Sequence, residues 1–216
     1  MTNKQGYSLD RRIKNLAERI KSSVGDNPLV FLDTCAVIDF EKEVRRARLV
    51  DQRITNALFF DSFLSALHLP IYITEHIYRE IEQHTRCRIS GHPEISRGTF
   101  RMVGNMHSDY CDFLKNVQGS AFEFDKVRYD VYWAGKMAFS NSHKKGCRDL
   151  ISVTDRELLS TALWARYTSI PMGEISEVKC ITDSIIVSSD SHIIETSRVL
   201  NNPEFGYSSL RTVSSR

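Results

Sequence analysis

Short apolar runs alternate along the chain with longer segments of helical period, and this alternation predicts an α/β fold. The run Leu29–Leu32 is apolar at every position, which is typical of a strand covered on both faces. Strands that alternate with helices indicate a parallel sheet between two helical layers, a three-layer α/β/α sandwich. The runs with the length of strands lie at 29–32, 69–74, 121–124, 184–189 and 209–213.

Segments in which apolar residues recur every three or four positions fill the intervals between these strands. Thr154 and Glu157 have the spacing of a capping box, so they predict the start of one of these helices. Glycine and proline at 88–106 and polar residues at 141–153 indicate loops instead. The predicted helices are 8–24, 41–67, 75–87, 107–117, 126–140, 154–167 and 191–200.

The chain divides into an N-terminal helical arm, 1–27, and a domain at 28–216 that contains an excursion at about 88–120. The helix of the arm carries an apolar stripe, which must be covered by other residues. It can pack on its own domain, or it can pair with a second copy of the chain in a homodimer. The stripe consists of Leu9, Ile13, Leu16, Ile20 and Val24.

Composition predicts a soluble cytoplasmic protein. The 216 residues suit one domain with an appendage, and no apolar stretch approaches the roughly 20 residues that span a bilayer. The first residues lack the apolar core of a secretory signal. Five widely spaced cysteines, an odd number with no C-x-x-C pair, indicate reduced thiols and not a disulfide framework.

The net charge is +2, but positive charge is unevenly distributed. Residues 84–150 contain 11 Lys and Arg against 7 Asp and Glu. A basic surface around a cleft would attract the phosphates of a nucleic acid. The alternative is an ordinary surface of mixed charge.

Four acidic residues lie at junctions between predicted strands and helices: Asp33, Glu80, Asp155 and Asp190. Ligands bind outside the carboxyl ends of the strands in open parallel sheets, so these acids are expected to converge in one cleft. Carboxylates about 5 Å apart repel by about 3 kcal/mol per pair at an effective dielectric of 20. Such a cluster therefore needs shifted pKa values or a bound cation. An all-carboxylate site suits Mg²⁺ or Mn²⁺ acting on phosphate.

Each of these acids also has a purely structural interpretation. Asp33 and Asp190 can cap the helices that follow them, and Asp155 suits the first turn of its helix. Glu80 can be a solvated helix residue. The four together favour a site, because an acid at every one of these junctions is not expected by chance.

The sequence also bears on two other chemistries. A phosphatase of the haloacid-dehalogenase type needs a second aspartate two positions after Asp33, where this chain has Cys35. Three His–Cys pairs have helical spacing and could bind zinc, but none has the C-x-x-C form of a structural zinc site, and ordinary packing of these residues is favoured. The pairs are His84 with Cys87, His107 with Cys111, and His143 with Cys147.

The chain resembles the PIN-domain nucleases in four motifs of matching order and spacing. They are V-F-L-D-T-C-A-V-I-D at 30–39, I-T-E-H-I-Y-R-E-I at 73–81, T-D-R-E-L-L-S-T-A-L at 154–163 and I-I-V-S-S-D-S-H-I at 185–193. The resemblance covers nearly the whole span 28–214 and implies a sheet of about five strands in the order 3-2-1-4-5. The run at 121–124 would be the third strand, at the edge.

The resemblance implies hydrolysis of single-stranded or structured RNA with Mg²⁺ or Mn²⁺, and for toxin-like members a protein inhibitor. It assigns the metal site to Asp33, Glu80, Asp155 and Asp190, with Thr34 and Ser188 in support. His192 departs from the pattern, because many relatives have another acid there, and the excursion at about 88–120 is longer than in small members. Two alternatives stay open: a non-cleaving RNA- or protein-binding module, and a structure-selective DNA nuclease.

Three cations in the polar link before Asp155, namely Lys144, Lys145 and Arg148, are candidates for binding substrate phosphates. Replacing all three with Ala is expected to raise the KM for RNA, to flatten its salt dependence and to leave kcat almost unchanged. Cleavage kinetics at several salt concentrations check this. Identical salt slopes for the variant and the wild type would show that the three residues only solubilise a loop.

Overall fold

The described part of the protein consists of helices arranged around a small parallel sheet. A computed structural model describes residues 3–23, 28–39, 66–67, 71–87, 121–140, 151–167, 183–205, 207 and 210–215. Residues 34–39 and 66–67 are also helical. The named elements are α1 (Asn3–Ser22), β1 (Pro28–Leu32), β2 (Ile71–Tyr72), α4 (Glu75–Cys87), α6 (Ala121–Ser140), α7 (Val153–Tyr167), β3 (Asp183–Val187), α8 (Ser191–Leu200), η2 (Pro203–Phe205) and β4 (Leu210–Val213).

The four described strands are all parallel and lie in the order β2-β1-β3-β4. β1 is interior, because Val30 pairs with Ile71 on one side and with Ile185 on the other. Every residue of the run Leu29–Leu32 is buried, as its uninterrupted apolar sequence predicts. The protein is therefore α/β with a parallel sheet at its centre.

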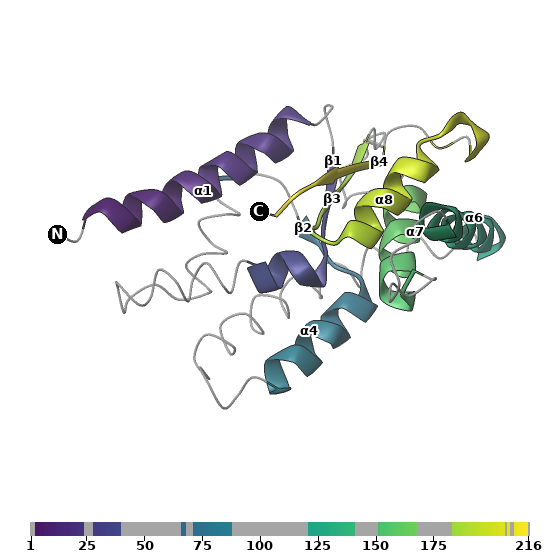
Figure 1. Cartoon of the computed structure of the whole chain (residues 1–216), viewed down its shortest axis with the longest axis horizontal. Coiled ribbons are helices and arrows are strands. Elements are labelled where there is room, and N and C mark those ends of the chain that lie inside the picture. Colours follow the sequence, from purple (N-terminus) through teal and green to yellow (C-terminus); the bar gives the residue numbers. More distant parts are fainter. Residues whose placement is uncertain are drawn as a thin grey trace, which may run out of the picture.

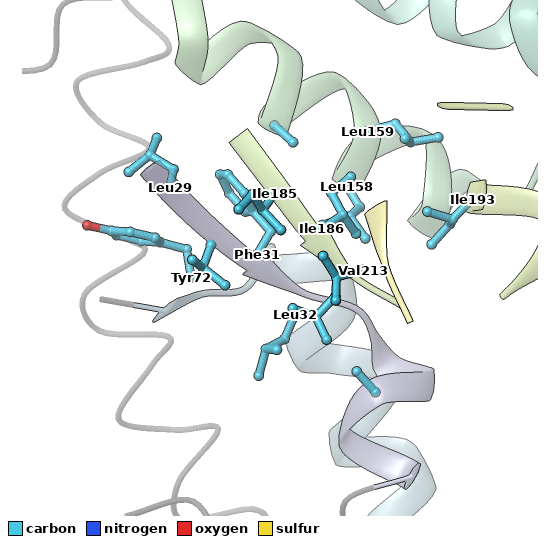
Figure 2. Packing of buried hydrophobic residues seen from close by; sticks show 14 of the residues in the cluster. Leu29, Phe31, Leu32, Tyr72, Leu158, Leu159, Ile185, Ile186, Ile193 and Val213 are labelled. Atoms are coloured by element: carbon cyan, nitrogen blue, oxygen red, sulfur yellow. The ribbon is translucent and has the colours of Figure 1, made fainter. Parts of the chain in front are cut away.

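Helices lie on both sides of this sheet (Figure 1). α6, α7 and α8 gather on one side, whereas α1 and the helical residues 34–39 lie on the other. Leu158 and Leu159 of α7 and Ile193 of α8 meet the strands in one continuous apolar cluster (Figure 2). This packing fixes the strands, so that the residues following each strand are held at a common edge of the sheet.

The arm helix α1 belongs to the same core. Its stripe residues Ile13, Leu16 and Ile20 are buried in the cluster that contains the sheet residues. Three of the five predicted stripe positions are therefore covered by the chain itself. The helix begins at Asn3, several residues before the predicted start. Among the described helices, none has the length and apolar character needed to cross a membrane.

The predicted strand at 121–124 is wrong, because these residues form the first turn of α6. Their apolar–polar alternation resembles a strand, but no breaker separates them from Val127 and Val131, and Phe124 continues that helical stripe. Its ring packs against the ring of Trp164 in α7, with centroids 6.3 Å apart. The described residues thus contain four strands, and the five-strand order 3-2-1-4-5 is not reproduced in them.

The predicted capping box is also wrong by two residues. α7 begins at Val153, and the hydroxyl of Ser152 accepts the backbone N–H of Asp155 at 3.0 Å, so Ser152 is the N-cap. Thr154 and Glu157 are consequently free for other contacts: Glu157 forms an ion pair with Arg128 of α6. Of the predicted helix 41–67 only residues 66–67 are described, and they are helical, whereas the predicted helix 107–117 lies outside the described residues.

A close approach of α6 to the chain before α7 depends on Gly135. A β-carbon at this position would lie 2.9 Å from Cγ2 and 3.0 Å from Cβ of Ile151. Ile is β-branched and stiff, so the contact cannot be relieved by rotation alone.

Gly135→Ala is expected to lower the free energy of unfolding by about 1–2 kcal/mol, although Ala is favoured over Gly by about 1 kcal/mol in an open helix. Denaturant unfolding measures this, with Lys136→Ala on the exposed face of the same helix as the control. A stabilised Gly135→Ala variant would contradict the close approach.

Candidate functional site

Asp33 stands directly after β1 at the carboxyl edge of the sheet and is 3% exposed. Its Oδ2 accepts two hydrogen bonds, from Ser188 Oγ at 2.8 Å and from Cys35 Sγ at 2.7 Å. Its backbone carbonyl accepts the N–H groups of Ala36 and Val37, which starts the helical residues 34–39. The side chain is therefore held by protein donors from two chain segments.

Glu80 reaches the same edge from the second turn of α4. Thr34 Oγ1 donates to its Oε2 at 2.7 Å, and Thr154 Oγ1 donates to its Oε1 at 2.8 Å. These two hydroxyls come from the residue after Asp33 and the residue before Asp155. Glu80 thus connects the start of the helix after β1 with the start of α7, which is not the behaviour of a solvated helix residue.

Asp190 follows β3 and caps α8: its Oδ1 accepts the backbone N–H of His192 at 2.6 Å. Nδ1 of His192 lies 3.5 Å from the same oxygen, and the His192 ring packs edge-on against Phe139 of α6 at a centroid distance of 4.5 Å. The structural interpretation of Asp190 as a cap is confirmed. It leaves Oδ2 without a role in the cap.

The charges of the four acids act on one another. Burial, as the largest cause, and the charges of Asp33, Asp190 and Glu80 together raise the pKa of Asp155 to about 6, against the effect of a hydrogen bond with Ser152. The pKa of Asp33 is also raised, first by burial and then by the charge of Asp190, against the hydrogen bonds from Cys35 and Ser188. The structure therefore brings the four sequence-predicted acids into one electrostatic unit.

Neutral groups, and not cations, hold these carboxylates. Among the described side chains, no Lys or Arg pairs with Asp33, Glu80 or Asp155. Their donors are hydroxyls, a thiol and, at Asp33, the backbone N–H of Thr34. Negative charge is thus concentrated at this edge without compensation from the described part of the chain.

The oxygen atoms of these side chains are the kind of ligand that a hard divalent cation takes, but their present arrangement is not that of a metal site. Carboxylate and hydroxyl oxygens are the ligands that Mg²⁺ and Mn²⁺ take, and a cation would offset the mutual repulsion. However, within the described residues no three His, Cys, Asp or Glu side chains are already arranged to hold a metal ion. Binding would require carboxylate side chains to rotate toward a common point.

Sequence reasoning missed two residues of this site. Cys35 was considered only as the absence of an aspartate, yet its thiol contacts Asp33, and burial together with the Asp33 charge raises its pKa to about 11, so the thiol keeps its proton at neutral pH. Thr154 was interpreted as a helix cap and instead binds Glu80. The sequence does contain one signal for this role: Thr154 is adjacent to Asp155, just as Thr34 is adjacent to Asp33.

Several predicted contributors lie outside the described residues. They are the cations Lys144, Lys145 and Arg148, both members of the pairs His107–Cys111 and His143–Cys147, and the side chains of His84 and Cys87. Comparison of the chain with protein-family models, with curated proteins and with solved structures gave no match.

The raised pKa of Asp155 predicts a pH-dependent stability. Its pKa of about 6 in the folded protein exceeds the ordinary value of 3.8, so the folded state binds the proton more tightly. The stabilisation is complete below about pH 4 and is lost as the pH rises through about 6.

Asp155→Asn removes the charge and is expected to raise the free energy of unfolding at pH 8 by about 3 kcal/mol, since each pKa unit corresponds to about 1.4 kcal/mol. The advantage should vanish at pH 4, where the wild-type carboxyl is protonated. Denaturant unfolding across this range in EDTA checks the claim, and a variant that is less stable at pH 8 would contradict it.

Proposed function

We propose that the protein is a metal-dependent endoribonuclease of the PIN-like type, with Asp33, Glu80, Asp155 and Asp190 binding Mg²⁺ or Mn²⁺. The observation that supports this most is the pKa of Asp155, which burial raises first and to whose increase three carboxylates from distant segments also contribute. Structural charge clusters also perturb pKa values, so the proposal further draws on the position of the four acids at the carboxyl edge of a parallel sheet.

The arrangement of strands supports the same assignment. The four acids follow β1, β2 and β3 or begin the helix before β3, and the interior strand β1 carries Asp33. The fifth strand of the PIN-like order has no counterpart among the described residues. The resemblance therefore rests on the four motifs and on the part of the sheet to which three of them belong.

When bound, a divalent cation in such a site lowers the pKa of water and stabilises charge on the phosphate and leaving oxygen. The chain's own residues position the ligands. Thr34 and Thr154 fix both oxygens of Glu80, and Ser188 fixes Oδ2 of Asp33. No nucleophilic side chain is required, because water attacks the phosphodiester. The imidazole of His192, held by Phe139 beside Asp190, is placed at the rim of the site.

A non-cleaving RNA-binding protein is the second candidate. The observations that favour it are the cap role of Asp190 and the lack, within the described residues, of a ready-made group of three metal ligands. Both functions predict RNA binding. Only the nuclease predicts that removal of the metal ion or of one carboxylate abolishes cleavage.

Asp33→Asn is expected to lower the rate of RNA cleavage by at least about 100-fold while leaving RNA binding intact, because the change removes a ligand charge and preserves shape. Cleavage of a labelled RNA hairpin in Mn²⁺, with and without EDTA, measures this. Asp125→Asn, on a side chain that is 73% exposed on α6, is the matched control and should cleave like the wild type.

Measuring the cleavage of flap DNA under the same conditions as that of the RNA hairpin shows which nucleic acid is the substrate. Cleavage of RNA that survives both EDTA and Asp33→Asn would contradict the metal-dependent mechanism. RNA binding without cleavage of either substrate in Mn²⁺ would establish the binding module instead.

A further inference from the structure

Asp39 is a buried acid that the proposed metal site does not use. It ends the helical residues 34–39 and is 8% exposed. Its Oδ2 accepts the hydroxyl of Ser189 at 2.7 Å and the hydroxyl of Ser215 at 2.9 Å. A buried carboxylate needs such donors to offset the loss of water. Asp39 thereby ties two other segments to the helix that follows Asp33.

Ser189 links Asp39 to the candidate site through its own backbone. Its N–H donates to Sγ of Cys35 at 3.1 Å, and the thiol of Cys35 donates to Oδ2 of Asp33. Asp190, the residue after Ser189, is connected to Asp33 in the same way. Its N–H donates to Oγ of Ser188 at 2.9 Å, and the hydroxyl of Ser188 in turn donates to Oδ2 of Asp33.

The direction of the two hydrogen bonds from the loop backbone is fixed, whereas the 3.3 Å contact between Sγ of Cys35 and Oγ of Ser188 can run either way. A backbone N–H can only donate, so the sulfur of Cys35 and the oxygen of Ser188 must accept from the loop. Their single hydrogens point to Asp33, because the contacts to its carboxylate, 2.7 and 2.8 Å, are shorter than the contact between the two side chains and are charge-assisted. The Ser189 hydroxyl lies 3.4 Å from the Cys35 sulfur but 2.7 Å from Asp39, and the shorter, charge-assisted bond determines where its hydrogen points.

Both side-chain donors to Asp33 are consequently set by the backbone of one three-residue loop, 188–190. That loop is held at its middle residue, because Ser189 is the residue that Asp39 binds. A shift of Ser189 would change the donor geometry at Asp33 and, through the N–H of Asp190, at the neighbouring acid as well. Oδ2 of Asp33 accepts both side-chain donors.

We propose that Asp39 and Ser189 are positioning residues, which hold the 188–190 loop so that Cys35 and Ser188 orient the carboxylate of Asp33 for cation binding. This inference rests on the proposed function, since it deepens the role of the same site. It gives the buried carboxylate of Asp39 and the thiol of Cys35 a role in the site.

Ser189 and Ser215 provide a matched pair of variants, because each contributes one hydroxyl to the same oxygen of Asp39 and only Ser189 belongs to the loop. In Ser189→Ala, calorimetric titration should show a Kd for Mn²⁺ about tenfold higher than in the wild type, as for other residues that support metal ligands. Ser215→Ala should stay within about twofold, and Ser189→Thr, which restores a hydroxyl, should recover most of the affinity. If the two hydroxyls only stabilised the fold, both Ala variants would show the same change in the Kd for Mn²⁺.

A second measurement does not depend on metal. In EDTA, amide hydrogen exchange at residues 189 and 190 should accelerate at least about tenfold in Ser189→Ala and remain unchanged in Ser215→Ala. If the wild type binds no Mn²⁺ while this exchange difference is seen, the loop assignment stands and the metal-dependent function fails. If the two Ala variants show equal Mn²⁺ affinity and equal exchange, the positioning roles of Asp39 and Ser189 are overturned.

Discussion

The buried charge of Asp33 is the constraint around which the carboxyl edge of the sheet is organised. A carboxylate at the end of an interior strand loses its water, and this loss raises its pKa. Ser188 and Cys35 compensate by donating hydrogen bonds to it. Both donors are oriented by backbone N–H groups of the loop after β3, so the pairing of β1 with β3 and the polar contacts at Asp33 depend on each other.

Apolar packing keeps the acids together against their mutual repulsion. The strands β1 and β3 and the helix α7 are buried in one cluster, so their ends cannot separate without exposing that core. The threonines beside Asp33 and Asp155 then hold Glu80 between them. A site of this kind lowers stability, and proteins retain such costs where function requires them.

Much of the fold was predictable from the sequence, because long apolar or periodic segments such as Leu29–Leu32 and the helix after Asp190 specify one structure. Strand parallelism predicts that Asp33 and Asp190 lie at one edge, whereas Glu80 and Asp155 reach it from helices, and the hydroxyls of Thr34 and Thr154 bind Glu80 there. The strand predicted at 121–124 failed because four residues of alternating polarity fit either structure, and packing of Phe124 on Trp164 decides for helix. Cys35 was missed because a thiol that donates to a carboxylate across the chain leaves no local pattern.

Crystals grown in Mn²⁺ would test the central claim most directly through an anomalous difference map measured at the manganese absorption edge. The account predicts a peak at the carboxyl edge of the sheet, within coordination distance of Asp33 and at least one other of the four acids, and its loss in Asp33→Asn crystals. A wild-type map with no peak there, or with manganese bound only elsewhere, would contradict the account.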